Sequence, residues 1–256
     1  MKIRDYLFRI WYWYVNKVDK NAEILFMNYG FHDEQNNLKL DEKDEANRFS
    51  IQLYDHLATS VDLKGLDIVE IGSGRGGGLS HVIRNHKPAS ARGIELDKRA
   101  VDFCKKHYVD EKLSFHHGDA QNLELEDASS DVVLNVESSH RYPSMKSFLS
   151  ETERILRPGG HLLITDFRYD HEMEELKQIL SESGLSIVSE RVINDEVLAA
   201  LTLDDNRKRI LVKKLVPKFL HKTALNFAGT IGSETYQQIE SGKYVYFSYI
   251  LKKNEN

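Results

Sequence analysis

The stretch LDIVEIGSGRGGG, from Leu66 to Gly78, decides the fold of this 256-residue chain. Its first half is an apolar run with the length and composition of a buried strand, and five glycines follow within seven residues. Glycine adopts backbone angles that other residues avoid, and its missing side chain lets a ligand lie against the main chain. The stretch therefore predicts a strand that ends in a tight turn which a ligand can approach.

The spacing of these glycines does not by itself identify the ligand. Gly72, Gly74 and Gly76 occupy alternate positions, which is tighter than the G-x-G-x-x-G pattern of pyrophosphate-binding turns. The span from Gly74 to Gly77 would still fit the second half of that pattern. The loop alone therefore does not exclude a nicotinamide-dependent enzyme.

Acidic residues after the next two predicted strands narrow the choice. In nucleoside-binding α/β folds, an acid at the end of the second strand accepts the ribose hydroxyls, and Glu95 has this position. A third strand at 113–117 leads into the sequence GDAQ, where Asp119 is placed to accept from the exocyclic amine of an adenine. The glycine turn and the two acids, at roughly equal intervals, together favour a nucleoside-containing ligand.

This combination resembles the class I S-adenosylmethionine-dependent methyltransferases, and the resemblance covers nearly the whole chain. Within that superfamily the sequence is similar to the phthiotriol/phenolphthiotriol dimycocerosates methyltransferase group of small-molecule O-methyltransferases. Three stretches carry the similarity: MNYGF at Met27–Phe31, DVVLNVESSHRYP at Asp131–Pro143 and RILRPGG at Arg154–Gly160. The resemblance implies S-adenosyl-L-methionine as the cofactor. It also implies a strand order of 3-2-1-4-5-7-6 with the seventh strand antiparallel.

Strands and helices alternate through the predicted core, which indicates right-handed crossovers and a parallel sheet. The predicted fold class is α/β: a Rossmann-like, mostly parallel sheet of seven strands with helices on both faces, plus a helical cap. Residues 1–60 are predicted to form an N-terminal helical cap or lid. Residues 61–256 are predicted to form the methyltransferase core, with a helical insertion at about 195–228.

Charge and composition limit the partners. The net charge of -5 and the pI of about 6.1 argue against a surface that follows nucleic-acid phosphates, so we expect no nucleic-acid partner. The single cysteine, Cys104, excludes an intrachain disulfide and gives no support for a structural zinc site, and we predict no metal ligands. The apolar run Ile10–Val15 is shorter than a membrane span and has no secretory cleavage site, so we expect a cytoplasmic protein. The oligomeric state stays open.

The N-terminal segment Ile3–Val18 mixes aromatic and basic side chains. Such a helix suits peripheral contact with a membrane or with a greasy substrate. We favour a helix that packs on the catalytic core, and membrane contact remains the alternative.

The chemistry of an O-methyltransferase needs a base, because an alcohol or phenol is a poor nucleophile until it loses its proton. His140 follows the fourth strand, in the segment that borders the methyl group in this fold, and we predict it to be the general base. Glu137 is a second catalytic candidate, which could orient His140, bind the acceptor or contact the cofactor. The predicted acceptor-binding residues are Tyr29, Tyr142 and Asp166.

The predicted cofactor-binding residues gather at the carboxyl ends of the first four strands, where open α/β sheets bind their ligands. They are Glu70, Gly72, Ser73, Gly74, Glu95, Leu96, Asp119, Ala120, Gln121 and Asn135. Among them, Glu70 is expected to brace the glycine turn and to approach the methionine ammonium group.

These observations predict an S-adenosylmethionine-dependent enzyme that methylates a hydroxyl of a hydrophobic small molecule, such as a polyketide, phenol or lipid. Carbon or nitrogen methylation of a sterol, quinone or amine is an alternative. A protein that binds S-adenosylmethionine without transferring its methyl group is a third possibility.

Overall fold

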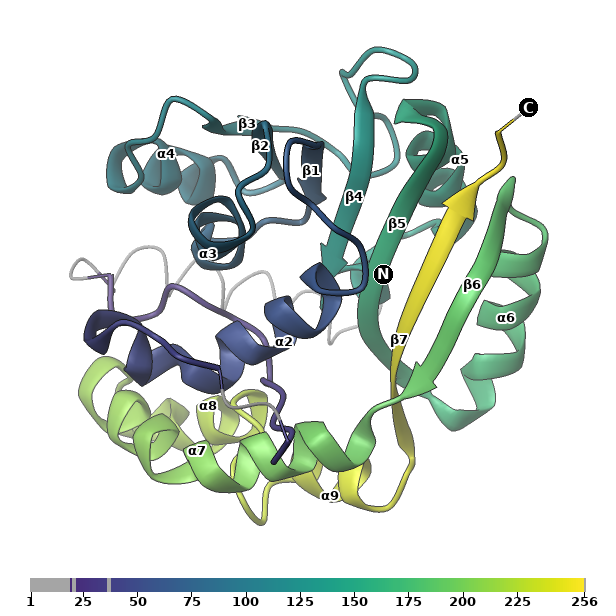
Figure 1. The fold of residues 1–256 in the computed structure, drawn as a ribbon. Coiled ribbons are helices and arrows are strands. Elements are labelled where there is room, and N and C mark those ends of the chain that lie inside the picture. The colour runs from purple at the N-terminus through teal and green to yellow at the C-terminus, as the bar shows by residue number, and fades with distance from the viewer. Residues whose placement is uncertain (1–18, 20–21, 36–37, 256) are drawn as a thin grey trace.

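The computed structural model describes residue 19, residues 22–35 and residues 38–255. A seven-stranded sheet with helices on both sides forms the centre of this part of the molecule (Figure 1). The predicted aromatic helix at 3–18 lies outside the described residues. In the described part, no helix is long and apolar enough to cross a membrane.

The sheet has the predicted topology. Its order is β3-β2-β1-β4-β5-β7-β6, and β7 runs antiparallel to both of its neighbours. The seven-stranded, mostly parallel α/β fold is therefore confirmed. The strands are β1 (Asp67–Ile71), β2 (Ser90–Glu95), β3 (Leu113–His117), β4 (Ser130–Val136), β5 (Leu156–Tyr169), β6 (Leu185–Val192) and β7 (Tyr244–Lys253).

Helices cover the sheet and extend beyond it. In Figure 1, the long helix α7 lies below α2 together with α8 and α9, on the side away from β1. The helices are η1 (Glu42–Asn47), α2 (Arg48–Ala58), α3 (Gly77–His86), α4 (Lys98–His107), η2 (Ser139–Arg141), α5 (Met145–Ile155), η3 (Asp170–Glu172), α6 (Met173–Ser181), α7 (Asn194–Leu215), η4 (Lys218–Leu220), α8 (His221–Phe227) and α9 (Glu234–Glu240).

The core has two faces because successive strand residues point to opposite sides of a sheet. On β1, Ile68 belongs to the same hydrophobic cluster as Leu57 of α2 and Leu79 of α3. Its neighbour Val69 belongs to the cluster that includes Phe148 of α5. Burial of each such side chain stabilises the fold by about 1.5–3 kcal/mol. The central strands β1 and β4 are buried on both faces, as expected for strands covered on both sides.

Two side-chain caps fix the helices that begin just after the strand ends. Asp97 accepts a hydrogen bond from Arg99 N at 2.9 Å and begins α4 two residues after Glu95. Ser144 accepts from Ser147 N at 3.1 Å and begins α5. Such caps satisfy backbone donors that the helix itself leaves unpaired. They determine where the loops between strand and helix end.

The N-terminal segment 22–35 runs between α2 and α7. Phe31 N donates to Phe49 O of α2 at 2.9 Å, and His32 N donates to Glu196 O of α7 at 3.0 Å. The carboxyl ends of β1 and β4, where the strand order reverses, lie next to this segment. Ligands of open α/β sheets bind at such a reversal point.

Candidate active site

The glycine turn after β1 needs its glycines for two reasons. Gly72, Gly74 and Gly76 have φ values of 79°, 53° and 75°, in the left-handed region that side chains disfavour. A Cβ atom on Gly72 would also lie 2.5 Å from the Cβ and Oγ atoms of Ser138. The turn therefore brings bare backbone up to the segment that follows β4.

Glu95 ends β2 and holds the glycine turn. Its Oε2 accepts from Gly74 N at 2.9 Å, and its Oε1 accepts from Asp97 N at 2.8 Å. Burial raises the pKa of Glu95, while these two backbone donors oppose the increase. A carboxylate oxygen has a second lone pair, so each oxygen can still accept from a ligand hydroxyl.

A cleft of ≈ 1250 Å³, here called the strand-end cleft, opens at the carboxyl ends of the strands. Leu96 on its rim is 60% exposed, which is unusual for a leucine and provides an apolar wall. Asp119, which follows the neighbouring strand β3, accepts from Gln121 N at 2.9 Å and so has a fixed orientation. The sequence-predicted residues that line this cleft are Gly72, Glu95, Leu96, Asp119, Ala120, Gln121, His140 and Tyr142.

Three of the other predicted residues support the cleft from behind. Glu70 is fully buried, and its Oε1 accepts from Tyr54 OH at 2.6 Å. Burial raises its pKa to about 8. Asn135 Nδ2 donates to Ile71 O at 2.9 Å and to Tyr142 OH at 2.9 Å. Ser73 is buried beneath the turn. Direct contact of these residues with a cofactor stays a prediction.

His140, in η2 after β4, is held by Asp166 at the end of β5. Its Nδ1 lies 2.7 Å from Asp166 Oδ1, and its backbone N donates to Asp166 Oδ2 at 2.8 Å. Burial on its own would raise the pKa of Asp166, but the charge of Arg168 and the hydrogen bonds from His140 and Ser139 outweigh it and hold the pKa well below its usual value. The carboxylate therefore stays ionised.

An ionised carboxylate only accepts hydrogen bonds, so the proton of a neutral His140 lies on Nδ1 and the lone pair on Nε2. Burial lowers the pKa of His140, although Asp166 opposes the decrease. The ring packs on Phe167 with a centroid distance of 4.5 Å. Asp166, predicted among the acceptor-binding residues, is 0% exposed and lies behind His140.

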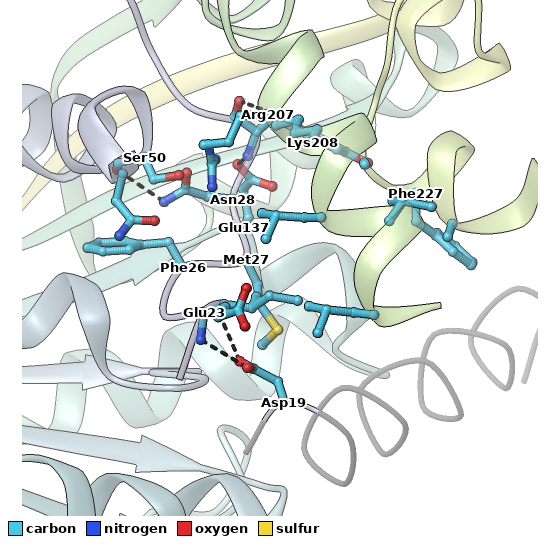
Figure 2. A pocket seen from close by; sticks show the side chains of 18 of the residues that line it. Asp19, Glu23, Phe26, Met27, Asn28, Ser50, Glu137, Arg207, Lys208 and Phe227 are labelled. Atoms are coloured by element: carbon cyan, nitrogen blue, oxygen red, sulfur yellow. Dashed lines mark hydrogen bonds between the residues drawn. The ribbon is translucent and has the colours of Figure 1, made fainter. Parts of the chain in front are cut away.

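A second, smaller cavity of ≈ 160 Å³, here called the cap cavity, lies between the N-terminal segment and the helices α7 and α8. Figure 2 shows Asp19, Glu23 and Met27 on one side of it and Lys208 and Phe227 on the other. Its walls are mainly apolar and include Met27, Leu211 and Leu215. His140 and Phe167 line both this cavity and the strand-end cleft, so the two spaces meet at His140.

Comparisons with known proteins agree with this arrangement. A family model described as "Methyltransferase domain" matches residues 69–164, from β1 to β5. The chain is 38% identical over 250 residues to the phthiotriol/phenolphthiotriol dimycocerosates methyltransferase of Mycobacterium tuberculosis, which covers 96% of this chain and 93% of the relative. The chain belongs to the class I S-adenosylmethionine-dependent methyltransferases.

This methyltransferase is also 37% identical to the fatty-acid O-methyltransferase of Mycolicibacterium smegmatis, over 86% of this chain and 81% of that protein. Among solved structures, the [4+2]-cyclase SpnF superimposes with a TM-score of 0.72 at 15% identity and covers 98% of this chain and 96% of that one. The likeness to SpnF, at 15% identity, shows the fold alone.

Glu137 of the methyltransferase fastens the N-terminal segment to the core. Its carboxylate accepts from Tyr29 N at 2.6 Å and from Tyr246 OH of β7. Its φ of 47° lies in the left-handed region, a conformation that costs free energy in a residue other than glycine. Burial raises its pKa to about 8. Tyr29, which also lines the cap cavity, packs on Phe167 at 5.7 Å.

Two charged residues of the methyltransferase have positions that sequence reasoning missed. Arg75, inside the glycine turn, is 1% exposed; its Nη2 lies 3.2 Å from Asp19 Oδ2, and its guanidinium lies 3.8 Å from the centre of the Phe103 ring. Lys208 faces the cap cavity and donates from Nζ to Tyr29 O at 3.3 Å, whereas the pattern of α7 predicts solvated charge there. Burial lowers the pKa of Lys208 to about 8.

Proposed function

We propose that this methyltransferase transfers the methyl group of S-adenosylmethionine to a hydroxyl oxygen of a lipid-like small molecule, with His140 as the general base. The supporting observation is that His140 lines both the strand-end cleft and the cap cavity while Asp166 holds its Nδ1 at 2.7 Å. A general base at the junction of the cofactor space and the acceptor space can reach the hydroxyl proton that must be removed.

In this proposal His140 Nε2 accepts the hydroxyl proton as the oxygen attacks. The buried ring is neutral near pH 7 because burial lowers its pKa, so its Nε2 carries a lone pair rather than a proton. Asp166 keeps the second nitrogen protonated and stabilises the imidazolium that forms, as the carboxylate does in related hydrogen-bonded pairs. Asp166 is then a positioning residue rather than an acceptor-binding one.

The cofactor would occupy the strand-end cleft. Glu95 can accept from the ribose hydroxyls with its remaining lone pairs, and Asp119 can accept from the adenine amine. Leu96 and Ala120 offer apolar surface for the ring. The bound cofactor supplies a methyl group that is already electrophilic because it is bonded to a sulfonium sulfur. The protein's main task is therefore to hold the acceptor oxygen in line, about 3–3.5 Å from that carbon.

The acceptor would enter the cap cavity with its reacting end toward His140. The apolar walls on α7 and α8 suit a hydrocarbon portion, and they exclude water that would compete for the base. The names of the mycobacterial relatives, which describe lipid-related acceptors, support the same class of molecule. Tyr29 lines the cap cavity and remains a predicted acceptor contact, whereas Tyr142, the other predicted contact, lines the strand-end cleft.

The test is incubation of the protein with methyl-labelled S-adenosylmethionine and fractionated lipids, followed by NMR of the labelled product. We expect an O-methyl group. We also expect His140→Ala to lower kcat about 10²–10⁴-fold with the cofactor Kd unchanged. His116→Ala, a change on exposed β3, is the matched control and should keep full activity.

Other outcomes would contradict the proposal. A label on carbon or nitrogen would identify the alternative methylation chemistry, and a fully active His140→Ala variant would remove the base. Tight cofactor binding without any labelled product from the lipids would favour a protein that does not transfer methyl groups.

A further inference from the structure

Three side chains that can bind metals meet between α2 and α3, away from both the strand-end cleft and the cap cavity. Asp55 comes from α2, and His81 and His86 come from α3. One carboxylate oxygen and one nitrogen of each imidazole all lie within 4.8 Å of one another. His86 Nε2 is 3.0 Å and His81 Nε2 is 3.9 Å from Asp55 Oδ1.

Hydrogen bonding leaves one of these atoms unsatisfied. His81 is 1% exposed, and its Nε2 has no hydrogen-bond partner among the described residues. The oxygen of Asp55 at 3.9 Å is beyond hydrogen-bond reach. A buried nitrogen without a partner is unfavourable, and such atoms are rare in folded proteins. The cluster thus keeps an unpaired imidazole nitrogen that points toward a carboxylate.

We propose that Asp55, His81 and His86 bind one divalent transition-metal ion, with zinc as the best match, which clips α2 to α3. This site is independent of the proposed methyl transfer. Two imidazoles and one carboxylate form a ligand set that zinc uses with a water molecule as fourth ligand. The side chain of His86 is 16% exposed, so water can reach the cluster.

The distances need only a small adjustment. Zinc bonds of about 2.0–2.1 Å to nitrogen and oxygen place the ligand atoms of a tetrahedral site about 3.3 Å apart. The pair formed by Asp55 and His86, at 3.0 Å, is already near this separation. The separation of His81 Nε2 from Asp55 Oδ1, now 3.9 Å, must shorten by roughly 0.6 Å, which a rotation of the His81 ring can supply.

The second nitrogen of His81 also has a suitable neighbour. A metal-bound imidazole keeps its proton on the other nitrogen and donates it to an oxygen nearby. The side-chain amide of Asn85 lies 3.1 Å from His81 Nδ1. As placed, this amide also donates from Nδ2 to His81 O at 3.0 Å, so metal binding would require it to exchange that bond for one in which its Oδ1 accepts the Nδ1 proton.

The consequence of metal binding is structural. Tyr54, the neighbour of Asp55, donates to Glu70 on β1, and its ring lies directly against Gly78 at the start of α3. An ion between α2 and α3 would therefore stabilise the packing under the glycine turn. It would raise the resistance to unfolding and leave the methyl-transfer chemistry untouched.

The test uses metal-free protein without an affinity tag. Zinc chloride is titrated by calorimetry, and cobalt(II) is added separately to look for the visible absorption of a tetrahedral site. We expect one zinc per chain and a rise in Tm of about 5–10 °C at free zinc about 100-fold above Kd. Magnesium, which prefers all-oxygen sites, should leave the Tm unchanged.

Variants make the assignment specific. His86→Asn, at the end of α3, should weaken zinc binding at least about tenfold and remove most of the rise in Tm, and His81→Asn should do the same if it folds. The control is His171→Asn, which changes an exposed imidazole 3.2 Å from Asp170 and should bind zinc normally. A wild-type Tm that does not respond to zinc, or zinc affinity in His86→Asn equal to that of the control, would overturn the proposal.

Discussion

Replacing Asp166 with asparagine tests how the proposed base is held. The carboxylate accepts from His140 Nδ1 at 2.7 Å, from His140 N at 2.8 Å and from Ser139 Oγ at 2.6 Å. Asparagine has nearly the same shape but only one acceptor oxygen, and its NH₂ group would face at least one of these donors. We expect kcat to fall about 10²–10⁴-fold because the ring loses its orientation and its countercharge. The cofactor Kd should not change, since Asp166 lines neither cavity.

The pH profile of the same variant separates a catalytic effect from a structural one. His140 works as a base only when neutral, and Asp166 raises its pKa against the lowering effect of burial. Loss of the carboxylate therefore lowers the pKa of His140, and the acidic limb of the kcat profile should move to lower pH. A loss of packing alone would reduce kcat without moving this limb.

Steady-state kinetics with labelled cofactor across the acidic range measure both quantities, and circular dichroism checks the fold. Asp170→Asn, at an exposed carboxylate a few residues away, is the matched control and should behave like the wild type. Unchanged turnover in Asp166→Asn, or an acidic limb that moves to higher pH, would refute the assignment of Asp166 as the residue that positions the base.

Three further changes test other parts of the structure. Glu95→Ala should weaken cofactor binding by about 1–3 kcal/mol, because it removes the acceptor for both ribose hydroxyls; calorimetry with S-adenosylhomocysteine measures this, and undiminished affinity would exclude the contact. Gly78→Ala should destabilise the fold by more than about 2 kcal/mol, because its Cβ would lie 1.9 Å from the Tyr54 ring, and urea unfolding should show the loss. Burial raises the pKa of Glu70 to about 8 in the folded protein, above its value of about 4.3 in an unfolded chain. The contribution of Glu70 to folding stability is therefore complete below about pH 4 and is lost as the pH rises to about 8. Glu70→Gln should therefore lose less stability than the wild type between about pH 5 and pH 8, and equal losses in urea unfolding would contradict this.

The fold could be predicted because its signals are local. β1 and β4 are mainly apolar runs, the glycine turn directly follows β1, and β2 and β3 end just before Leu96 and Gly118, so β1 to β4 could be placed within a few residues. The position of β7 between β5 and β6 came from the family resemblance. Hydrophobic periodicity identifies strands but carries no information about their order.

The sequence could predict those residues of the site whose positions follow from the ends of the strands. Glu95 and Asp119 line the cleft because Glu95 is the last residue of β2 and Asp119 lies just after β3. The pair formed by His140 and Asp166 joins residues 26 positions apart, and that of Arg75 and Asp19 joins residues 56 positions apart. Neither pairing has a signature in local sequence, since each depends on how separate elements pack.

Two contacts hold the N-terminal segment and the residue before it against the core, and these contacts bear on product release. Asp19, which precedes the segment, pairs with Arg75; Glu137 accepts from Tyr29 N within the segment; and lining residues from Glu23 to Tyr29 form a wall of the cap cavity. In the proposed reaction, a methylated product that leaves past this wall must break one of these two contacts. Release of that product then requires a buried ion pair or a buried carboxylate contact to break. Acceptors with bulkier tails should therefore slow product release rather than the methyl-transfer step.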